Sequence, residues 1–371
     1  MNIFIDEQYL QDINPEDIRA YLRQKGWQEM RYADTRLQVF VHRQADSDPV
    51  LLLLPVSHDL SDFLPRMIDA LVTLAKVEKT TPDSLLRTIR VASDDIIRMR
   101  LLLPADTMPS IELTAQFLSG FRDLVISAAT IESGEKTRYF KRSTEIGKQE
   151  AQHFQFCHTS PGSFGFAMAS PLVEQRLFPD ESPPLSRRVV ERITRGLLTV
   201  QDAEMEHNAL PISQRYEDGL NANMCYAVAA MLEDLQDTKV EYSVDWSLRL
   251  RAPRDIAQLR PISLDRTCTV YLNRAGDHLK EMSDPGARDL GEQDIHGNIT
   301  ELKSNDEENR SIIIAAYNYT QDIETSLSEE DYKLACDAHR DRRPITIRGT
   351  LISKRGKKNW QLLNPHGLIV R

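Results

Sequence analysis

The sequence lacks the short motifs that mark the commonest catalytic sites. It contains no Gly-x-Gly-x-x-Gly, no Walker phosphate-binding loop, no Gly-x-Ser-x-Gly and no His-Glu-x-x-His. These patterns hold the phosphate, the nucleophile or the zinc ion in Rossmann enzymes, P-loop NTPases, α/β-hydrolases and zincin proteases. Their absence argues against an enzyme of any of these classes, and we expect no cofactor.

Cysteine and long hydrophobic runs are also scarce. The four cysteines are far apart, and no Cys-x-x-Cys pair exists that would indicate a zinc knuckle. The longest apolar run, Val50 to Val56, is too short to span a bilayer. The first seven residues end in Asp6 and Glu7, and such an early acidic pair is unlike a signal peptide. We therefore expect a cytoplasmic, bacterial protein with reduced thiols and no membrane partner.

Basic residues are outnumbered by acidic ones. The chain has 46 Lys and Arg against 56 Asp and Glu, and its formal net charge is −10. This balance favours solubility and argues against a protein coated by nucleic acid, although it permits a local basic groove. A length of 371 residues with 41% hydrophobic residues is typical of two or three globular domains.

The order of the predicted elements indicates an α+β body followed by a small terminal module. We predict an N-terminal α/β domain over residues 1–133, a basic linker over 134–150, a second α/β domain over 151–283 and a small barrel over 293–371. Each half of the body is predicted as hairpin, helix, helix, strand and helix. The repeated order indicates a structural duplication, although no matching residues support it.

The terminal module has the alternation of apolar and polar residues that is typical of half-buried strands. Its predicted strands are Gly297 to Lys303, Ser311 to Tyr319, Ile323 to Leu327, Ile345 to Leu351 and Asn359 to Leu363. A helix that starts at Ser328 precedes the fourth strand. This is the layout of the OB-fold, a five-stranded Greek-key barrel that often binds oligonucleotides.

The end of the chain also resembles a group of uncharacterised bacterial proteins in which an α/β body precedes a small barrel. The resemblance rests on Gly349-Thr350-Leu351 and on Trp360-Gln361-Leu362-Leu363-Asn364-Pro365. It covers the chain loosely and carries no assigned activity. It therefore implies a fold and no function.

Positive charge is concentrated beside aromatic residues in two segments, one in the module and one in the linker. The candidate nucleic-acid contacts in the module are Arg348, Lys354, Arg355, Lys357, Lys358 and Trp360. Those in the linker are Lys136, Arg138, Tyr139, Lys141 and Arg142. Cations of this kind neutralise phosphates, and aromatic rings stack on bases. The alternatives are a solvated turn with Trp360 in the core, and an exposed connector that Tyr139 fastens to a domain.

Three further groups have a simpler structural interpretation. Four arginines lie largely off the apolar stripe of a predicted helix: Arg187, Arg188, Arg192 and Arg195. They could contact phosphate or an acidic partner, but the pattern favours a charged solvent face. Glu204 and its neighbours at the end of that helix have metal-binding side chains, but a frayed polar terminus explains them. Asp294 with Glu301-Leu302-Lys303 faintly resembles a metal-dependent nuclease motif, and also fits the first strand of the barrel.

The leading hypothesis is a non-enzymatic protein that binds nucleic acid, single-stranded or duplex, on its own or as a subunit of a larger bacterial complex. A protein–protein scaffold or regulator is the first alternative, and a metal-dependent nuclease is the second.

Overall fold

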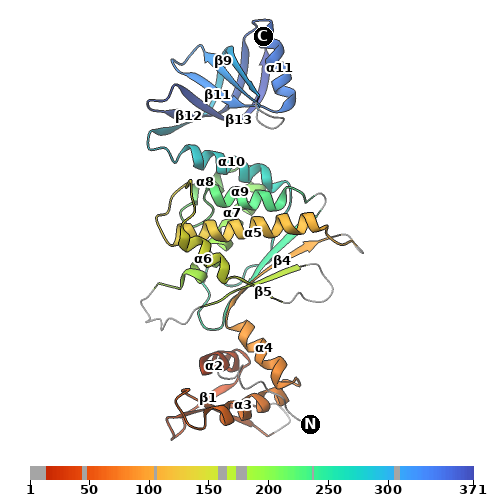
Figure 1. Ribbon diagram of the computed structural model, residues 1–371, viewed down its shortest axis with the longest axis vertical. Helices are drawn as coiled ribbons and strands as arrows, with labels where there is room; N and C mark the ends of the chain where they lie inside the picture. Colours follow the sequence, from red (N-terminus) through yellow and green to blue (C-terminus); the bar gives the residue numbers. More distant parts are fainter. Residues whose placement is uncertain are drawn as a thin grey trace. The chain divides into compact units, whose positions relative to one another are not determined.

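The structure is a computed structural model that contains both helices and sheets (Figure 1), which confirms the predicted α+β class. It describes residues 14–43, 48–103, 107–157, 165–172, 182–235, 238–304 and 310–371. The chain forms two compact units, and each unit is built from segments that are separate in the sequence. The first unit comprises residues 1–108, 149–194 and 239–263, and the second comprises 109–148, 195–238 and 264–371.

The first unit begins with a three-stranded antiparallel sheet that packs against helices. The strands are β1 (Gln28–Met30), β2 (Leu37–His42) and β3 (Val50–Pro55), in the order β1-β2-β3. The helices are α2 (Pro15–Gln24), α3 (Phe63–Val77) and α4 (Pro82–Ala92). As predicted, Asn14 caps α2 by accepting a hydrogen bond from the Glu16 amide at 2.9 Å.

Strand β3 lies in the longest apolar run of the sequence, and a continuous apolar run is typical of a central strand. In the structure β2 is central and β3 is an edge strand. Leu51 and Leu53 of β3 are 56% and 39% exposed, whereas Leu52 and Leu54 face the core. The continuous apolar run arises because the strand has leucines on both its buried and its exposed face.

A second sheet has the strand order β5-β6-β4-β7-β8. Its strands are β4 (Asp95–Leu102), β5 (Gln155–Phe156), β6 (Gly165–Ser170), β7 (Lys239–Asp245) and β8 (Ile262–Leu264). Strand β4 lies antiparallel between β6 and β7, so it joins two segments that follow it by more than sixty residues in the sequence. This five-stranded sheet differs from the three-stranded β1–β3 sheet in its number and order of strands. The predicted duplication and the predicted domain boundaries stay hypotheses.

Helix α7 (Leu185–Met205) carries charged side chains that are buried, contrary to the prediction of a solvated arginine face. The Arg187 and Arg192 side chains are each 1% exposed, because the helix is covered on nearly all sides. In the first unit, Arg187 Nε lies 2.7 Å from Asp95 Oδ2, and its guanidinium lies 5.0 Å from the centre of the Trp246 ring. Burial raises the pKa of Asp95 to about 6, although the positive charge of Arg187 opposes the shift.

The helical part of the second unit brings together elements from both sides of α7. Its elements are α5 (Ile111–Glu132), α8 (Leu210–Gln214), α9 (Ala222–Leu232) and α10 (Cys268–Glu281), and α6 (Glu145–His153) follows α5 in the chain. The segment between residues 210 and 232 forms two helices, α8 and α9, and not one continuous helix. Asn221 causes the interruption, because its side chain caps α9 by accepting a hydrogen bond from the Met224 amide at 3.0 Å.

The second unit ends in five strands that form a closed barrel in the order β10-β11-β13-β12-β9. They are β9 (Ala287–Ser304), β10 (Arg310–Ala316), β11 (Asp322–Ser326), β12 (Ile345–Lys354) and β13 (Asn359–Val370), with α11 (Glu329–Arg340) before β12. Strands β11 and β13 are parallel, and the other neighbours are antiparallel. All five predicted strands and the helix are present, but β9 begins ten residues earlier than predicted and β13 extends further.

Strand β9 is shared between two neighbours, and it changes partner at Gly297. Its first part pairs with β12, its second part pairs with β10, and Gly297 itself pairs with both Ile345 and Ala316. A Cβ atom on Gly297 would lie 2.2 Å from the Ala315 carbonyl oxygen, so no larger residue fits. The interior of the barrel is apolar, with buried isoleucines such as Ile312 and Ile347.

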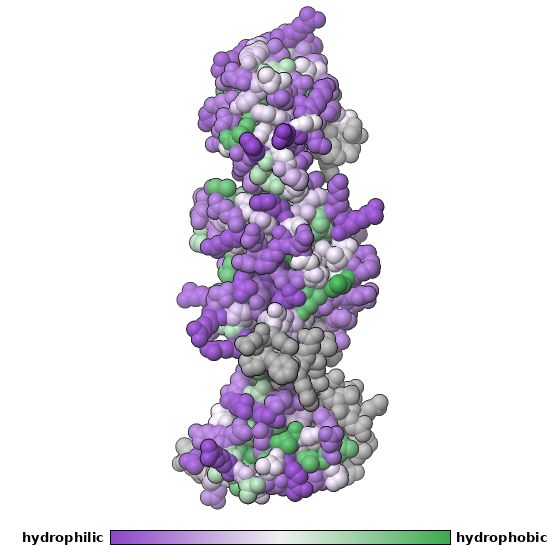
Figure 2. Space-filling model, turned by 90° about the vertical axis from the view of Figure 1, so that its left-hand side faces the viewer, coloured by the Kyte–Doolittle hydropathy of each residue, from purple (hydrophilic) through white to green (hydrophobic). Residues whose placement is uncertain are grey.

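The face of the molecule in Figure 2 is mainly hydrophilic, and its hydrophobic areas are separate from one another. Among the residues that the structure describes, no helix combines the length and the apolar character needed to cross a membrane.

We predict that Gly297→Ala destabilises the barrel by about 1–3 kcal/mol, because the added methyl group meets backbone that cannot move aside. Hydrogen exchange of the barrel amides should become faster in this variant. The neighbouring Asn298 is exposed, so Asn298→Ala should stay within about 0.5 kcal/mol of the unaltered chain. Equal exchange rates in the two variants would show that the close approach at Gly297 is not a constraint.

We predict that Arg187→Met costs about 3–5 kcal/mol at pH 8, because it leaves the Asp95 carboxylate buried without its cation. An Asp whose pKa is raised on folding favours the folded state below its unfolded pKa, and this contribution is lost as the pH rises through the folded value. The loss should therefore be smaller at pH 5 than at pH 8, as measured by denaturant unfolding.

The matched control is Arg98→Met. Arg98 forms an ion pair with Asp245 at 2.6 Å, but both side chains are substantially exposed, at 41% and 59%. Its loss should cost less than about 1 kcal/mol at either pH. If the loss of stability caused by Arg187→Met were equal at pH 5 and pH 8, protonation of Asp95 would not relieve it, and the prediction would be wrong.

Candidate functional site

The β12–β13 turn and the β10–β11 turn emerge from the same end of the barrel. This follows from the parallel pairing of β11 and β13, in which Asp322 lies opposite Asn359. Each of these residues is the first of its strand, so the turn that precedes each strand lies at that end. The arrangement joins two segments that are separated by α11 and β12 in the sequence.

The predicted cations of the barrel divide into two groups. Arg348 donates two hydrogen bonds of 2.7 Å to Asp294 and thereby lowers the pKa of that carboxyl, and Lys354 forms an ion pair with Glu281 of α10. Arg355, Lys357 and Lys358 are exposed and form no ion pair with any residue that the structure describes. The turn thus offers three positive charges that no carboxylate in the described part of the chain neutralises.

Aromatic side chains lie near these charges. Trp360 follows the basic turn and packs partly against the barrel core, as the alternative interpretation expected. Its ring centre is 5.7 Å from that of Tyr319, which comes from the β10–β11 turn. Tyr317 in the same turn is 60% exposed. Tyr317 was not among the predicted contacts, because its position at the same end of the barrel as the basic turn follows only from the pairing of β11 with β13.

The outer surface of the barrel beside these turns is partly acidic. Lys303 of β9 lies 2.9 Å from Glu324 of β11, and Gln361 donates a hydrogen bond to the same carboxylate. Glu301 is exposed nearby on β9, opposite Ile313 of β10. This part of the strand surface thus carries one ion pair and the exposed carboxylate of Glu301.

The cations of the predicted linker are mostly engaged within the second unit. Lys136 forms an ion pair with Asp218 at 3.1 Å, and the Arg138 guanidinium lies 4.8 Å from the centre of the Tyr216 ring. Lys280 approaches the Tyr139 ring in the same way, at 5.8 Å. Lys141 and Arg142 are exposed and make no ion pair with the residues that the structure describes.

The linker backbone is fixed to the start of α9. The Arg138 carbonyl accepts a hydrogen bond from the Ala222 amide at 2.9 Å, and the Asn223 side chain bonds both the amide and the carbonyl of Phe140. This segment is thus held as a connector, and its last residues belong to α6. Six of the eleven predicted contacts in the linker and the barrel therefore already have a partner within the chain.

The structure does not assemble the nuclease motif. Asp294 and Glu301 are seven residues apart on β9, which corresponds to roughly 20 Å along an extended strand. Asp294 is bound by Arg348 and Lys303 by Glu324, so neither side chain is available to a shared metal ion.

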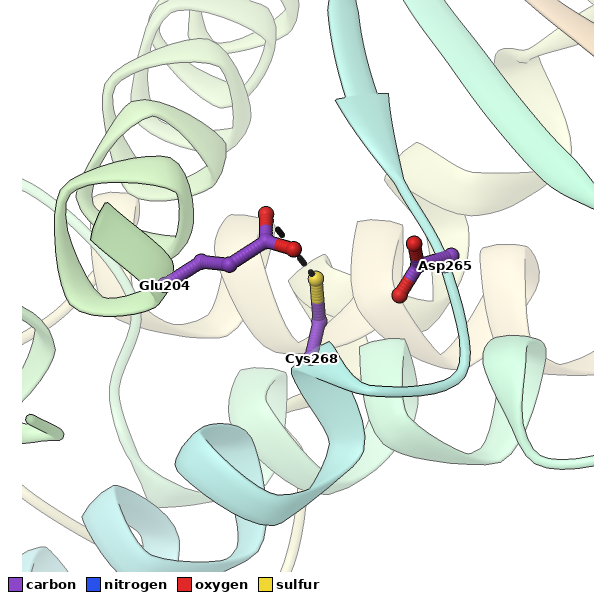
Figure 3. Close-up of side chains that lie close together, drawn as sticks. All are labelled: Glu204, Asp265 and Cys268. Atoms are coloured by element: carbon purple, nitrogen blue, oxygen red, sulfur yellow. Dashed lines mark hydrogen bonds between the residues drawn. The ribbon is translucent and has the colours of Figure 1, made fainter. Parts of the chain in front are cut away.

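A different group of potential metal ligands meets where α7 ends and α10 begins. Glu204 comes from α7, Asp265 from the loop after β8, and Cys268 from the first turn of α10. Their side chains point toward one another (Figure 3), and one ligand atom of each lies within 4.8 Å of the others. The Cys268 sulfur lies 3.9 Å from Glu204 Oε2.

The environment of this group disfavours a free thiolate. Cys268 is 0% exposed, and its burial raises the pKa of the thiol to about 11, with the negative charges of Glu204 and Asp265 adding to the shift. The Thr267 amide donates a hydrogen bond to Asp265 Oδ1 at 2.9 Å. Glu204 was identified from the sequence as a residue with a metal-binding side chain. Its proximity to Asp265 and Cys268 depends on the fold, because it lies on a distant segment of the chain.

No protein-family model, curated protein or solved structure matches this chain.

Proposed function

We propose that this protein is a non-enzymatic nucleic-acid-binding protein, on its own or within a larger complex, and that the β12–β13 turn is its main contact. The observation that carries the proposal is the set of three exposed cations on this turn, Arg355, Lys357 and Lys358, which form no ion pair with the residues that the structure describes. Each charge can replace a counterion on a phosphate backbone without first breaking an ion pair within the protein.

The strand connectivity supports the same proposal. A meander of three strands, a helix, two further strands and a parallel pairing between the third and fifth strands form the layout of the OB-fold. Loops of OB-folds, including the one between the fourth and fifth strands, take part in binding oligonucleotides. In this chain that loop is the basic turn.

We further propose that the preferred ligand is single-stranded. Tyr317 is exposed at the end of the barrel from which the basic turn emerges, where its ring can stack on an unpaired base. In a duplex the bases are already stacked and paired, so the ring has little to contact. The acidic residues on β9 and β11 restrict the contact to the turns.

A protein–protein scaffold is the second candidate, and a specific surface favours it. Met30, Leu51 and Leu53 are 50%, 56% and 39% exposed on the β1–β3 sheet. Met30 and Leu53 both pair with Val39, so their side chains share one face of the sheet. Apolar side chains gathered on one sheet face are typical of contact surfaces.

The first test measures the binding of labelled single strands and duplexes by fluorescence anisotropy at several salt concentrations. The variant carries Arg355→Gln, Lys357→Gln and Lys358→Gln. Because it loses three phosphate contacts, the slope of log affinity against log salt for a single strand should become shallower by about 2. The unaltered chain should bind most tightly at low salt.

The control carries Lys141→Gln and Arg142→Gln, which removes exposed cations from the linker. It should bind almost as well as the unaltered chain. Failure of the unaltered chain to bind either ligand at low salt would reject the proposal and favour the scaffold. Loss of binding in the control alone would transfer the site to the linker.

The second test concerns stacking. Tyr317→Ser should weaken single-strand binding by about 1–3 kcal/mol and duplex binding by less, because it removes a ring from an exposed turn and leaves the charges intact. Tyr32→Ser is the matched control, since Tyr32 is similarly exposed, at 53%, in the other unit. Equal losses for both ligand types would contradict a preference for unpaired bases.

A further inference from the structure

A groove lies between α5 and α9 in the second unit. Its volume is about 370 Å³, which is within the range of small-molecule sites in proteins. The two helices touch at Gly120, where a Cβ atom would lie 3.0 Å from the Ala227 carbonyl oxygen. Beside this contact, small side chains such as Ser119 and Ala230 line the groove. Small residues explain why there is space between the helices, but they do not by themselves make a binding site.

Hydrogen bonds between its walls fix the shape of the groove. Gln116 of α5 donates to the Ala230 carbonyl of α9 at 3.1 Å. The segment between α5 and α6 forms the third wall, and the Asn223 side chain ties its backbone to α9. The Thr144 amide ties the same segment to α5 by donating to Thr130 Oγ1 at 3.3 Å. Each wall is thus bonded to the other two, so the groove is preformed, as ligand sites usually are.

Ser127 is the observation that points to a ligand. It lines the groove and is only 6% exposed, yet its hydroxyl makes no hydrogen bond with any residue that the structure describes. Thr114 and Ser133, near the two ends of the same helix, each donate to the backbone carbonyl four residues earlier. This is the usual bond of a helical hydroxyl. A buried hydroxyl without a partner costs free energy, so Ser127 is placed to bond a group within the groove.

The remaining polar atoms of the groove are mainly acceptors and hydroxyls. Asp123 accepts from Arg122 through Oδ1, and its Oδ2 makes no hydrogen bond in the described part of the chain. The Gln116 amide nitrogen is already bonded to α9, which leaves its oxygen as an acceptor. The hydroxyls of Ser119 and Ser143 form no hydrogen bond with described residues. A ligand that satisfies these atoms must donate several hydrogen bonds.

The charges of the lining indicate an uncharged ligand. Asp123 is the one charged side chain among the described residues that line the groove, and Arg122 pairs with it at 3.1 Å. The lining therefore offers no cation to an anionic ligand and no unpaired carboxylate to a cationic one. Ile126 and Ala227 add apolar surface. A neutral molecule with several hydroxyl groups on a compact carbon frame matches both the acceptors and the apolar wall.

We propose that the groove between α5 and α9 binds an uncharged, polyhydroxylated ligand of the sugar class. Its hydroxyl groups donate to Asp123 Oδ2 and to Gln116 Oε1, and one of them pairs with the buried hydroxyl of Ser127. Two kinds of molecule carry this chemistry, a free saccharide and the ribose of a nucleoside. The site is separate from the β12–β13 turn, so the inference does not depend on the proposed function.

The experiment records saturation-transfer difference NMR of the full chain with glucose and with adenosine as separate probes at millimolar concentration. At least one of them should receive saturation, and the one that does identifies the source of the hydroxyl groups. Tetrahydropyran and dideoxyadenosine keep the rings but lack the vicinal hydroxyls, so they should receive little, because the acceptors of the site would stay unpaired. No transfer to either probe, or equal transfer to the analogues, would overturn the proposal.

Three variants locate the site. Ser127→Ala should weaken the affinity for the probe by about 2–10-fold, since one hydrogen bond between uncharged groups is lost. Ala230→Trp fills the groove and keeps its polar side chains, so it should abolish the transfer. Ser133→Ala is the matched control, because its hydroxyl bonds the backbone of its own helix and should not affect binding.

Circular dichroism verifies that each variant is folded. Unchanged transfer in folded Ala230→Trp, or equal affinities in Ser127→Ala and Ser133→Ala, would reject the groove as the site. All three variants leave the β12–β13 turn intact, so nucleic-acid binding can be measured in them independently.

Discussion

The pairing of β9 with two different neighbours is the constraint on which the barrel depends. Strand β9 pairs with β12 along its first half and with β10 along its second half. It thereby joins the two edges of the sheet and closes the barrel. The change of partner brings the backbone at Gly297 so close to Ala315 that a side chain has no room. Closure in turn sets β11 beside β13, and this parallel pair places the basic turn and the tyrosines of the β10–β11 turn at one end.

The barrel could be predicted from sequence because its strands are half buried. Ile345 and Ile347 face the core while Arg348 and Thr350 do not, and a period of two identifies such a strand without further information. The first part of β9 escaped prediction because Arg288 to Glu292 are exposed. Their strand conformation comes from hydrogen bonds to β12, which begins more than fifty residues later. The position of β3 was missed for a related reason, since leucine on both faces imitates a central strand.

The candidate site was less predictable than the fold, because a cation is available only if no carboxylate approaches it in three dimensions. Lys354 and Lys358 belong to the same basic segment of the sequence. Lys354 forms an ion pair with Glu281, whereas Lys358 forms none with the residues that the structure describes. Arg187 shows that the exposure of a basic residue is equally hard to predict from sequence. A basic residue off the apolar stripe of a helix normally faces water. Arg187 is nevertheless buried, because α7 has no solvent-exposed face at this position. The partner that decides each case lies on a distant segment.

Helix α10 supports the basic turn from outside the barrel. Its first residue is Cys268 and its last is Glu281, which binds Lys354 at the end of β12; the Arg355 amide also donates a hydrogen bond to the Gly286 carbonyl just beyond the helix. A helix of 14 residues is about 20 Å long and is stiff over that length. The start of the basic turn is therefore held by a stiff helix as well as by the strands of the barrel.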